Sequence, residues 1–212
     1  MEQKIERVLV LAPHTDDGEF GCGGSIAKFI EEGKAVYYVA FSTAEKSVPE
    51  GWPKDILKTE VKEATKRIGI NPANLFIYNY EVRKLNYVRQ EILEELVKLK
   101  KEIKPDLVFL PTLNDLHQDH QTVAAEATRA FKQVSMMGYE LPWNTITFHT
   151  QAFIKLGKSH VDKKIHALTA YNSQSQKEYA REDFIRGWAK TRGTQIGADY
   201  AEAFEITRWI IA

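Results

Sequence analysis

The stretch from Val8 to Gly24, VLVLAPHTDDGEFGCGG, limits the possible folds more than any other part of the chain. It begins as a short apolar run and turns at a proline into a polar corner rich in glycine. An apolar run this short, bounded by turn residues, is typical of a buried strand, and Ser25 signals a helix just beyond. Ligands of open α/β sheets bind beyond the carboxyl ends of the strands. The stretch therefore predicts a site containing His14, Asp16 and Asp17 at one strand end.

Three further apolar runs alternate with segments that have helical periodicity. The predicted strands are residues 35–41, 75–78 and 107–110, and the predicted helices are residues 25–32, 55–68, 87–103 and 118–131. Four strand-then-helix units in succession predict a parallel sheet with right-handed crossovers. The fold class expected is therefore α/β, with helices on both faces of a mostly parallel sheet.

The last third of the chain is less regular. Its patterns predict strands over 145–149 and 203–211, a helix over 162–171 capped by Asp162, and a helix over 175–190. The sequence shows no repeat, low-complexity tract or linker. With 212 residues, the chain is expected to form a single domain over 1–212.

Composition excludes several classes of protein. Lys plus Arg and Asp plus Glu both total 29, so no bulk charge favours nucleic acid or a membrane surface as partner. The one cysteine, Cys22, excludes an intramolecular disulfide. The sequence shows neither a signal peptide nor a window of membrane-span length. These features predict a cytoplasmic enzyme.

A second polar loop, TLNDLHQDH, follows the predicted strand at 107–110 and repeats the pattern of the first. The two loops hold three of the six histidines, His14, His117 and His120. Because adjacent parallel strands lie about 4.8 Å apart, loops at their ends can face one another across a cleft. Two imidazoles and a carboxylate around an open position are typical of catalytic zinc, and a free carboxylate beside them can act as general base. Spacing alone leaves open whether His117 or His120 is the ligand.

Other residues of these loops have simpler interpretations. Glu19 and Asp115 are expected to orient ligands. The glycines at 21, 23 and 24 are expected to allow close packing of the helix start, although a phosphate cradle is an alternative. Cys22 is expected to be a small buried residue and not a fourth ligand. The histidines at 149, 160 and 166 are expected to be structural or exposed, and residues 42–53 form a candidate lid.

Two signatures resemble the PIG-L (LmbE-like) family of zinc-dependent N-acetylglucosaminyl deacetylases. PHTDDGEFGCGG is close to the family's P-H-P-D-D-x-E followed by glycines, and DLHQDH matches D-x-H-x-D-H. Weaker similarity continues along the chain at Glu60, 160–164, 173–174 and 192–204. The resemblance implies a Rossmann-like fold and a metal-dependent amidohydrolase that removes the acetyl group from an N-acetylated amino sugar or its conjugate.

The resemblance also implies roles for individual residues. His14, Asp17 and His120 would bind one Zn²⁺ per chain, although His/Asp sites accept other divalent metals. Asp16 would be the general base. His117 would stabilise the oxyanion or protonate the leaving amine, with Asp119 tuning it. Family members often form trimers or hexamers, which predicts a homo-oligomer.

Two departures from the family pattern leave the substrate open. Thr15 replaces the usual proline, and Leu57 or Lys58 stands where the family often has an arginine that contacts substrate. Two other hypotheses are a phosphoesterase with two metal ions about 3.5–4 Å apart and a sugar-binding domain without turnover. The number of metal ions per chain would distinguish the phosphoesterase from a deacetylase. Release of a free amine would distinguish a deacetylase from the sugar-binding domain.

Overall fold

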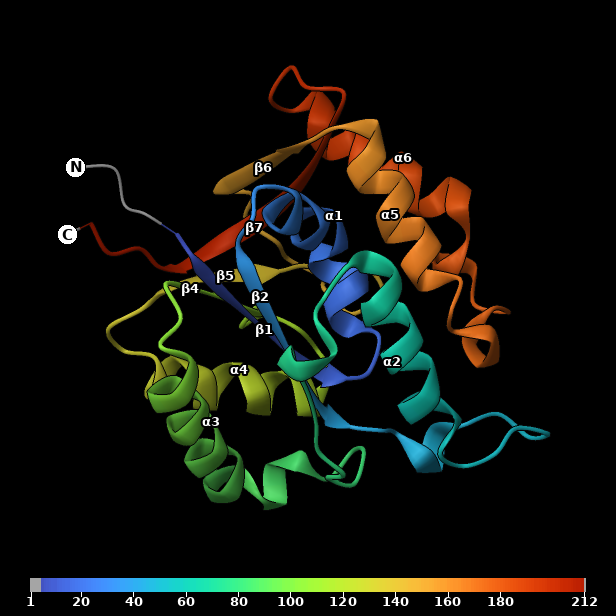
Figure 1. Cartoon of the computed structure of the whole chain (residues 1–212), viewed down its shortest axis with the longest axis vertical. Coiled ribbons are helices and arrows are strands. Elements are labelled where there is room, and N and C mark those ends of the chain that lie inside the picture. The colour runs from blue at the N-terminus through green and yellow to red at the C-terminus, as the bar shows by residue number, and fades with distance from the viewer. Residues whose placement is uncertain (1–4, 212) are drawn as a thin grey trace.

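The computed structural model describes residues 5–211 and contains a seven-stranded sheet of order β3-β2-β1-β4-β5-β7-β6 (Figure 1). The strands are β1 Arg7–His14, β2 Ala35–Ser42, β3 Leu75–Ile77, β4 Leu107–Pro111, β5 Ser135–Tyr139, β6 Ala152–Leu156 and β7 Tyr200–Arg208. The first five strands are parallel, whereas β7 pairs antiparallel with both β5 and β6. The predicted mostly parallel α/β fold is confirmed.

Helices cover both faces of the sheet (Figure 1). They are α1 Asp17–Glu31, α2 Ile56–Ile68, α3 Arg89–Ile103, α4 Gln118–Ala130, α5 Lys158–Leu168 and α6 Glu182–Thr194. One apolar core joins the sheet to α1, α2 and α5, and a second joins the opposite face to α3 and α4. Because both faces are buried, the central strands are continuous apolar runs, as parallel strands usually are. None of the helices within residues 5–211 has the length and apolar character to cross a membrane.

The predictions for the chain up to Phe131 match the observed strands and α-helices with one main difference. The helix predicted over 25–32 begins at Asp17, because the glycine-rich segment is itself helical and buried. A Cβ at Gly21 would overlap the ring of Tyr139, and a Cβ at Gly18 would overlap the ring of Tyr38. Close packing as the reason for glycine in this segment is therefore confirmed.

The predictions for the chain after Phe131 were less accurate, although the strand predicted over 203–211 overlaps β7. The predicted strand over 145–149 is wrong: these residues form a loop, with a single bridge between Thr145 and Asp115. Neither β5 nor β6 was predicted. Helix α5 starts at Lys158, so Asp162 lies inside it and does not cap it. The helix predicted over 175–190 is a short 3₁₀ turn, Glu178–Ala180, followed by α6, because Arg181 between them is extended.

Candidate metal centre

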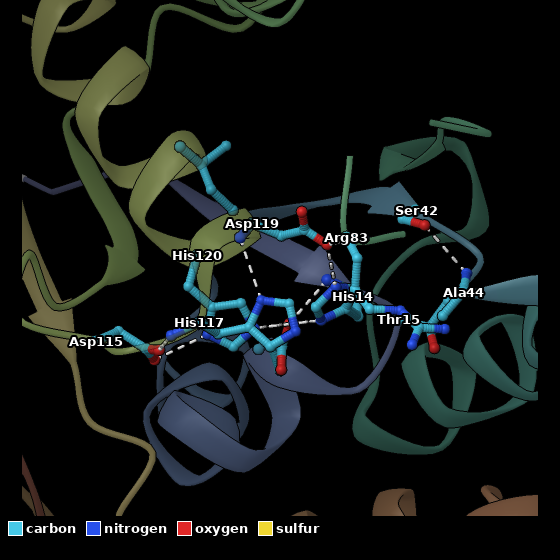
Figure 2. Close-up of polar contacts among 12 residues, drawn as sticks. His14, Thr15, Ser42, Ala44, Arg83, Asp115, His117, Asp119 and His120 are labelled. Carbon is cyan, nitrogen blue, oxygen red and sulfur yellow. Dashed lines mark hydrogen bonds and ion pairs between the residues drawn. The ribbon is translucent and has the colours of Figure 1, made fainter. Parts of the chain in front are cut away.

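The two polar loops meet because their strands are neighbours. Strands β1 and β4 pair in parallel, so the loops that follow them emerge at the same edge of the sheet. Helix α1 begins directly after the first loop and α4 directly after the second. Figure 2 shows the imidazoles of His14, His117 and His120 facing one another, with Asp115 and Asp119 beside them. Nitrogen atoms of the three histidines lie within 4.8 Å of one another.

Three atoms that could bind a metal form a tight triangle in this cluster. His14 Nδ1 lies 3.2 Å from Asp17 Oδ2, His120 Nε2 lies 3.2 Å from the same oxygen, and the two nitrogens are 3.2 Å apart. Ligand atoms at tetrahedral zinc, with bonds of about 2.0–2.1 Å, are separated by about 3.3–3.4 Å. The triangle therefore has dimensions that fit a zinc ion.

The second nitrogen of each of these two imidazoles contacts a buried carboxylate. His14 Nε2 lies 3.0 Å from Asp119 Oδ2, and His120 Nδ1 lies 2.8 Å from Asp115 Oδ2. Both carboxylates are 0% exposed. Histidines that ligate a metal typically donate their other N–H to such a carboxylate, which fixes the tautomer and the ring orientation. The expectation that Asp115 orients a histidine agrees with this contact.

Charge in the cluster favours a cation at its centre. Burial alone would lower the pKa of His120, but Asp17 and Asp115 raise it to about 10. Burial would likewise lower the pKa of His14, yet Asp17 and Asp119 raise it above its ordinary value. Carboxylates that stabilise protonated imidazoles at this point stabilise a divalent cation by the same Coulomb attraction.

The adjacent carboxylates Asp16 and Asp17 lie in opposite environments. Burial would raise the pKa of Asp17, but His120 and His14 hold it well below its ordinary value. Burial and the charge of Asp17 raise the pKa of Asp16. Asp16 occupies the N-cap position of α1, yet its side chain makes no capping hydrogen bond. A pair of carboxylates with diverging pKa values is typical of groups that divide acid–base work.

The ring of His117 is oriented by the backbone. The N–H of Asp119 donates to His117 Nδ1 at 3.1 Å, so the proton of the neutral imidazole is on Nε2. Burial and the neighbouring His120 and His14 lower the pKa of His117 to about 4. A neutral His117 therefore presents an N–H donor.

The carboxylate of Asp119 is held by the segment between β3 and α3. The N–H of Arg83 donates to Asp119 Oδ2 at 2.6 Å, and the N–H of Leu85 donates to Oδ1 at 3.2 Å. Arg83 has a φ of +68°, a left-handed conformation that is strained for a residue with a side chain. The Asp119 side chain contacts His14, and its backbone N–H contacts His117. No pattern in the sequence pointed to Arg83 or Leu85.

Glu19 is linked to the first loop through two tyrosine hydroxyls. Its carboxyl group lies within hydrogen-bond distance of the hydroxyls of Tyr38 and Tyr171, and each of these hydroxyls also lies within hydrogen-bond distance of the carbonyl of Thr15. Burial raises the pKa of Glu19 to about 8. Glu19 therefore positions the loop without touching the histidine cluster. Cys22 is buried, as expected, and its thiol donates to the carbonyl of Gly18.

A cavity of about 240 Å³ opens beside the cluster. Its polar lining includes the three histidines, Asp16 and Asp17, and its aromatic and aliphatic lining includes Phe20, Leu57, Val82, Trp143 and Tyr179. A largely apolar cavity with a few polar groups fits a small molecule with a polar reacting group.

The positions expected to determine specificity differ in their access to the cavity. Leu57 lines it, whereas Lys58 is exposed and is not among its lining residues. From the candidate lid at 42–53, Ala44 and Ser47 reach the cavity. Lys177, which the sequence did not single out, is the one lysine or arginine lining this cavity within the described chain.

Fold and site together define the class: an α/β protein with a histidine–aspartate cluster at the carboxyl ends of parallel strands. The family model described as "PIG-L: GlcNAc-PI de-N-acetylase" matches residues 9–131. The chain belongs to the PIG-L family.

One relative in sequence and two solved structures are similar to this chain. A probable N-acetyl-alpha-D-glucosaminyl L-malate deacetylase 2 of Bacillus anthracis is 27% identical, covering 81% of this chain and 83% of the relative. The N,N′-diacetylchitobiose deacetylase of Pyrococcus horikoshii superposes with a TM-score of 0.81 at 23% identity, covering 97% of this chain and 85% of that chain. A 4-carboxy-2-hydroxymuconate hydratase from Pseudomonas putida KT2440 has a TM-score of 0.78 at 18% identity, covering 98% of each chain. Since a hydratase shares the fold, the fold alone does not select the reaction.

Proposed function

We propose that the protein is a zinc-dependent N-deacetylase that hydrolyses the amide of an N-acetylated amino sugar or its conjugate. The observation that carries the proposal is the triangle of His14 Nδ1, Asp17 Oδ2 and His120 Nε2, with sides of 3.2 Å. Membership of a family described as GlcNAc-PI de-N-acetylase supports the substrate class.

The donor set fits zinc, with another divalent metal as the alternative. Two imidazole nitrogens and one carboxylate oxygen are common ligands of catalytic zinc and leave a fourth position open. When bound, the ion supplies a Lewis acid and a water nucleophile that is available at neutral pH. We assign His14, Asp17 and His120 as its ligands, one ion per chain.

The remaining chemistry is assigned to side chains of the cavity wall. Asp16 lines the cavity, makes no capping bond and has a raised pKa, so it suits a general base that accepts a proton from the attacking water. His117 presents Nε2–H, which suits donation to the oxyanion that develops on the amide carbonyl. Collapse of the tetrahedral species breaks the C–N bond, and the proton held by Asp16 passes to the amine. Asp119 orients His14 through its carboxylate and His117 through its backbone.

The contacts of the other acids argue against the two-metal phosphoesterase. Such a site needs several carboxylates free to bridge two ions. Glu19 is hydrogen-bonded to two tyrosines. Asp115 contacts His120 and one backbone N–H, and Asp119 contacts His14 and two backbone N–H groups. The sugar-binding alternative needs neither Asp16 nor His117.

Several broader features are part of the proposal. Residues 1–212 are taken as one deacetylase domain, cytoplasmic and assembled as a homo-oligomer. The partner is a small N-acetyl sugar or conjugate, with no nucleic acid or membrane involved.

Metal analysis combined with an amine-release assay tests the proposal. The purified protein is expected to hold one zinc per chain and to release acetate and a free amine from members of a panel of N-acetylglucosamine conjugates. Treatment with a chelator should abolish release, and added zinc should restore it. Two ions per chain with phosphate-ester hydrolysis would instead establish the phosphoesterase.

A further inference from the structure

A buried ion pair lies against α1 and does not line the cavity beside the histidine cluster. Lys164 comes from α5 and Glu202 from β7, and their Nζ and Oε1 atoms are 2.7 Å apart. Their side chains are 3% and 5% exposed. Both elements pack against α1, whose first residue is Asp17 (Figure 1). Burying two charges is costly unless each finds further partners.

Those partners are backbone groups at a break in α1. Cys22, with φ −143° and ψ 25°, is not helical, and it divides α1 into two segments. In an uninterrupted helix the N–H of Gly24 would donate to the carbonyl of Phe20. Here the N–H of Gly24 donates to Glu202 at 2.9 Å, and the carbonyl of Phe20 accepts from Lys164 at 2.6 Å. The ion pair is thus inserted where one helical hydrogen bond would be.

The signs of the two charges match the two helix ends. The ammonium of Lys164 lies at the carboxyl end of the first segment, where carbonyls carry partial negative charge. Glu202 lies at the amino end of the second segment, where it also accepts from the N–H and the hydroxyl of Ser25 at 2.7 and 2.6 Å. Each charge is stabilised by a helix end as well as by its partner.

The first segment is little more than one turn. A single turn is not stable alone, because nucleating a helix costs more than its first hydrogen bond returns. This turn carries Asp17 at its first position and Phe20 in the cavity wall. Its position therefore depends on the side chains that hold it, which include Tyr38 on the N–H of Gly18.

We propose that Lys164 and Glu202 are positioning residues for the metal centre. By closing both ends of the break in α1, they fix the turn that presents Asp17 to His14 and His120. The link to metal affinity rests on the proposed function, whereas the local order of the turn does not.

The experiment compares Glu202→Gln and Lys164→Met with the wild-type full-length chain. Zinc affinity, measured by competition with a chromophoric chelator, is expected to fall at least tenfold in each variant. Amide exchange of residues 17–25, followed by mass spectrometry without added metal, is expected to accelerate at least tenfold. Glu202→Gln keeps the shape of the side chain, so it carries the test if Lys164→Met yields too little folded protein.

Glu126→Gln provides a matched control. Glu126 is also a fully buried carboxylate, paired with Arg89 and Arg129 at 2.6 Å, but it makes none of the contacts around α1. The control is expected to leave zinc affinity within twofold of wild type and exchange of residues 17–25 unchanged. Unchanged affinity and exchange in the Lys164 and Glu202 variants, or equal losses in the control, would overturn the proposal. If the wild-type chain binds no zinc, the proposed function fails and the exchange data alone decide the role of the ion pair.

Discussion

Replacing Asp16 by asparagine separates the two adjacent aspartates by function. Asp17 contributes an oxygen to the 3.2 Å triangle, whereas Asp16 lines the cavity and makes no capping hydrogen bond. The Asp16→Asn variant is therefore expected to keep zinc content at one per chain. Fold stability should not fall either, because the change breaks no capping bond and removes a charge beside the like charge of Asp17.

The loss expected from Asp16→Asn is in the catalytic rate. A positioned general base contributes about 10²- to 10⁴-fold, which corresponds to about 2.7–5.4 kcal/mol of activation free energy at 1.36 kcal/mol per tenfold. Amine release from N-acetylglucosamine conjugates measures kcat, metal analysis measures zinc, and urea unfolding measures stability. Asp17→Asn is the comparison variant, which should lose zinc. A kcat of Asp16→Asn within tenfold of wild type would remove Asp16 from the base role, and loss of zinc would make it a ligand.

Four further outcomes are expected. Asp119→Asn should weaken zinc binding about 10- to 100-fold in chelator competition, because the outer partner of a ligating histidine is typically worth that much; unchanged affinity would contradict the contact with His14. Thr15→Val should raise the free energy of unfolding by about 1 kcal/mol in urea, because the buried Thr15 hydroxyl has no hydrogen-bond partner in the described chain and valine removes this cost. Gly21→Ala should lower the free energy of unfolding by about 1–3 kcal/mol, because the added methyl group overlaps the ring of Tyr139. Gly187→Ala, at a position in α6 where the methyl group meets open space, should raise the free energy of unfolding by about 0.5–1 kcal/mol. Equal effects of the two variants would refute the packing argument. Zinc at 100 times its Kd should stabilise the metal-free protein by about 2.7 kcal/mol, seen as a rise in Tm; no rise would mean that the folded state does not bind the ion.

The position of the site, at the carboxyl ends of β1 and β4, could be predicted because it depends on local sequence patterns. Apolar runs ending at Pro13 and Pro111 identified two strand ends, and parallel topology brought the loops after them together. Strands β5 and β6 were missed, whereas the strand predicted over 203–211 overlaps β7. The pattern of β5, SMMGY, is weak because it has no β-branched residue and contains a glycine. At this end, the order of the strands within the sheet also differs from their order in the sequence, because β7 lies between β5 and β6.

Contacts between distant segments could not be predicted. The N–H groups of Arg83 and Leu85 hold Asp119 from a loop without periodicity, and no residue-type signal marks a backbone donor. The break in α1 was equally hidden, because its glycines suggested a loop where the partners on α5 and β7 allow a helix.

The place of Glu202 on the last strand bears on how the protein is made. The segment that contains His14 and Asp17 leaves the ribosome well before β7, because Glu202, whose carboxylate completes the break in α1, is translated 178 residues after Gly24. Strand β7 must also insert between β5 and β6 before the sheet is complete. A nascent chain stalled before residue 200 therefore has every proposed ligand and base, yet lacks the strand that anchors the turn carrying Asp17.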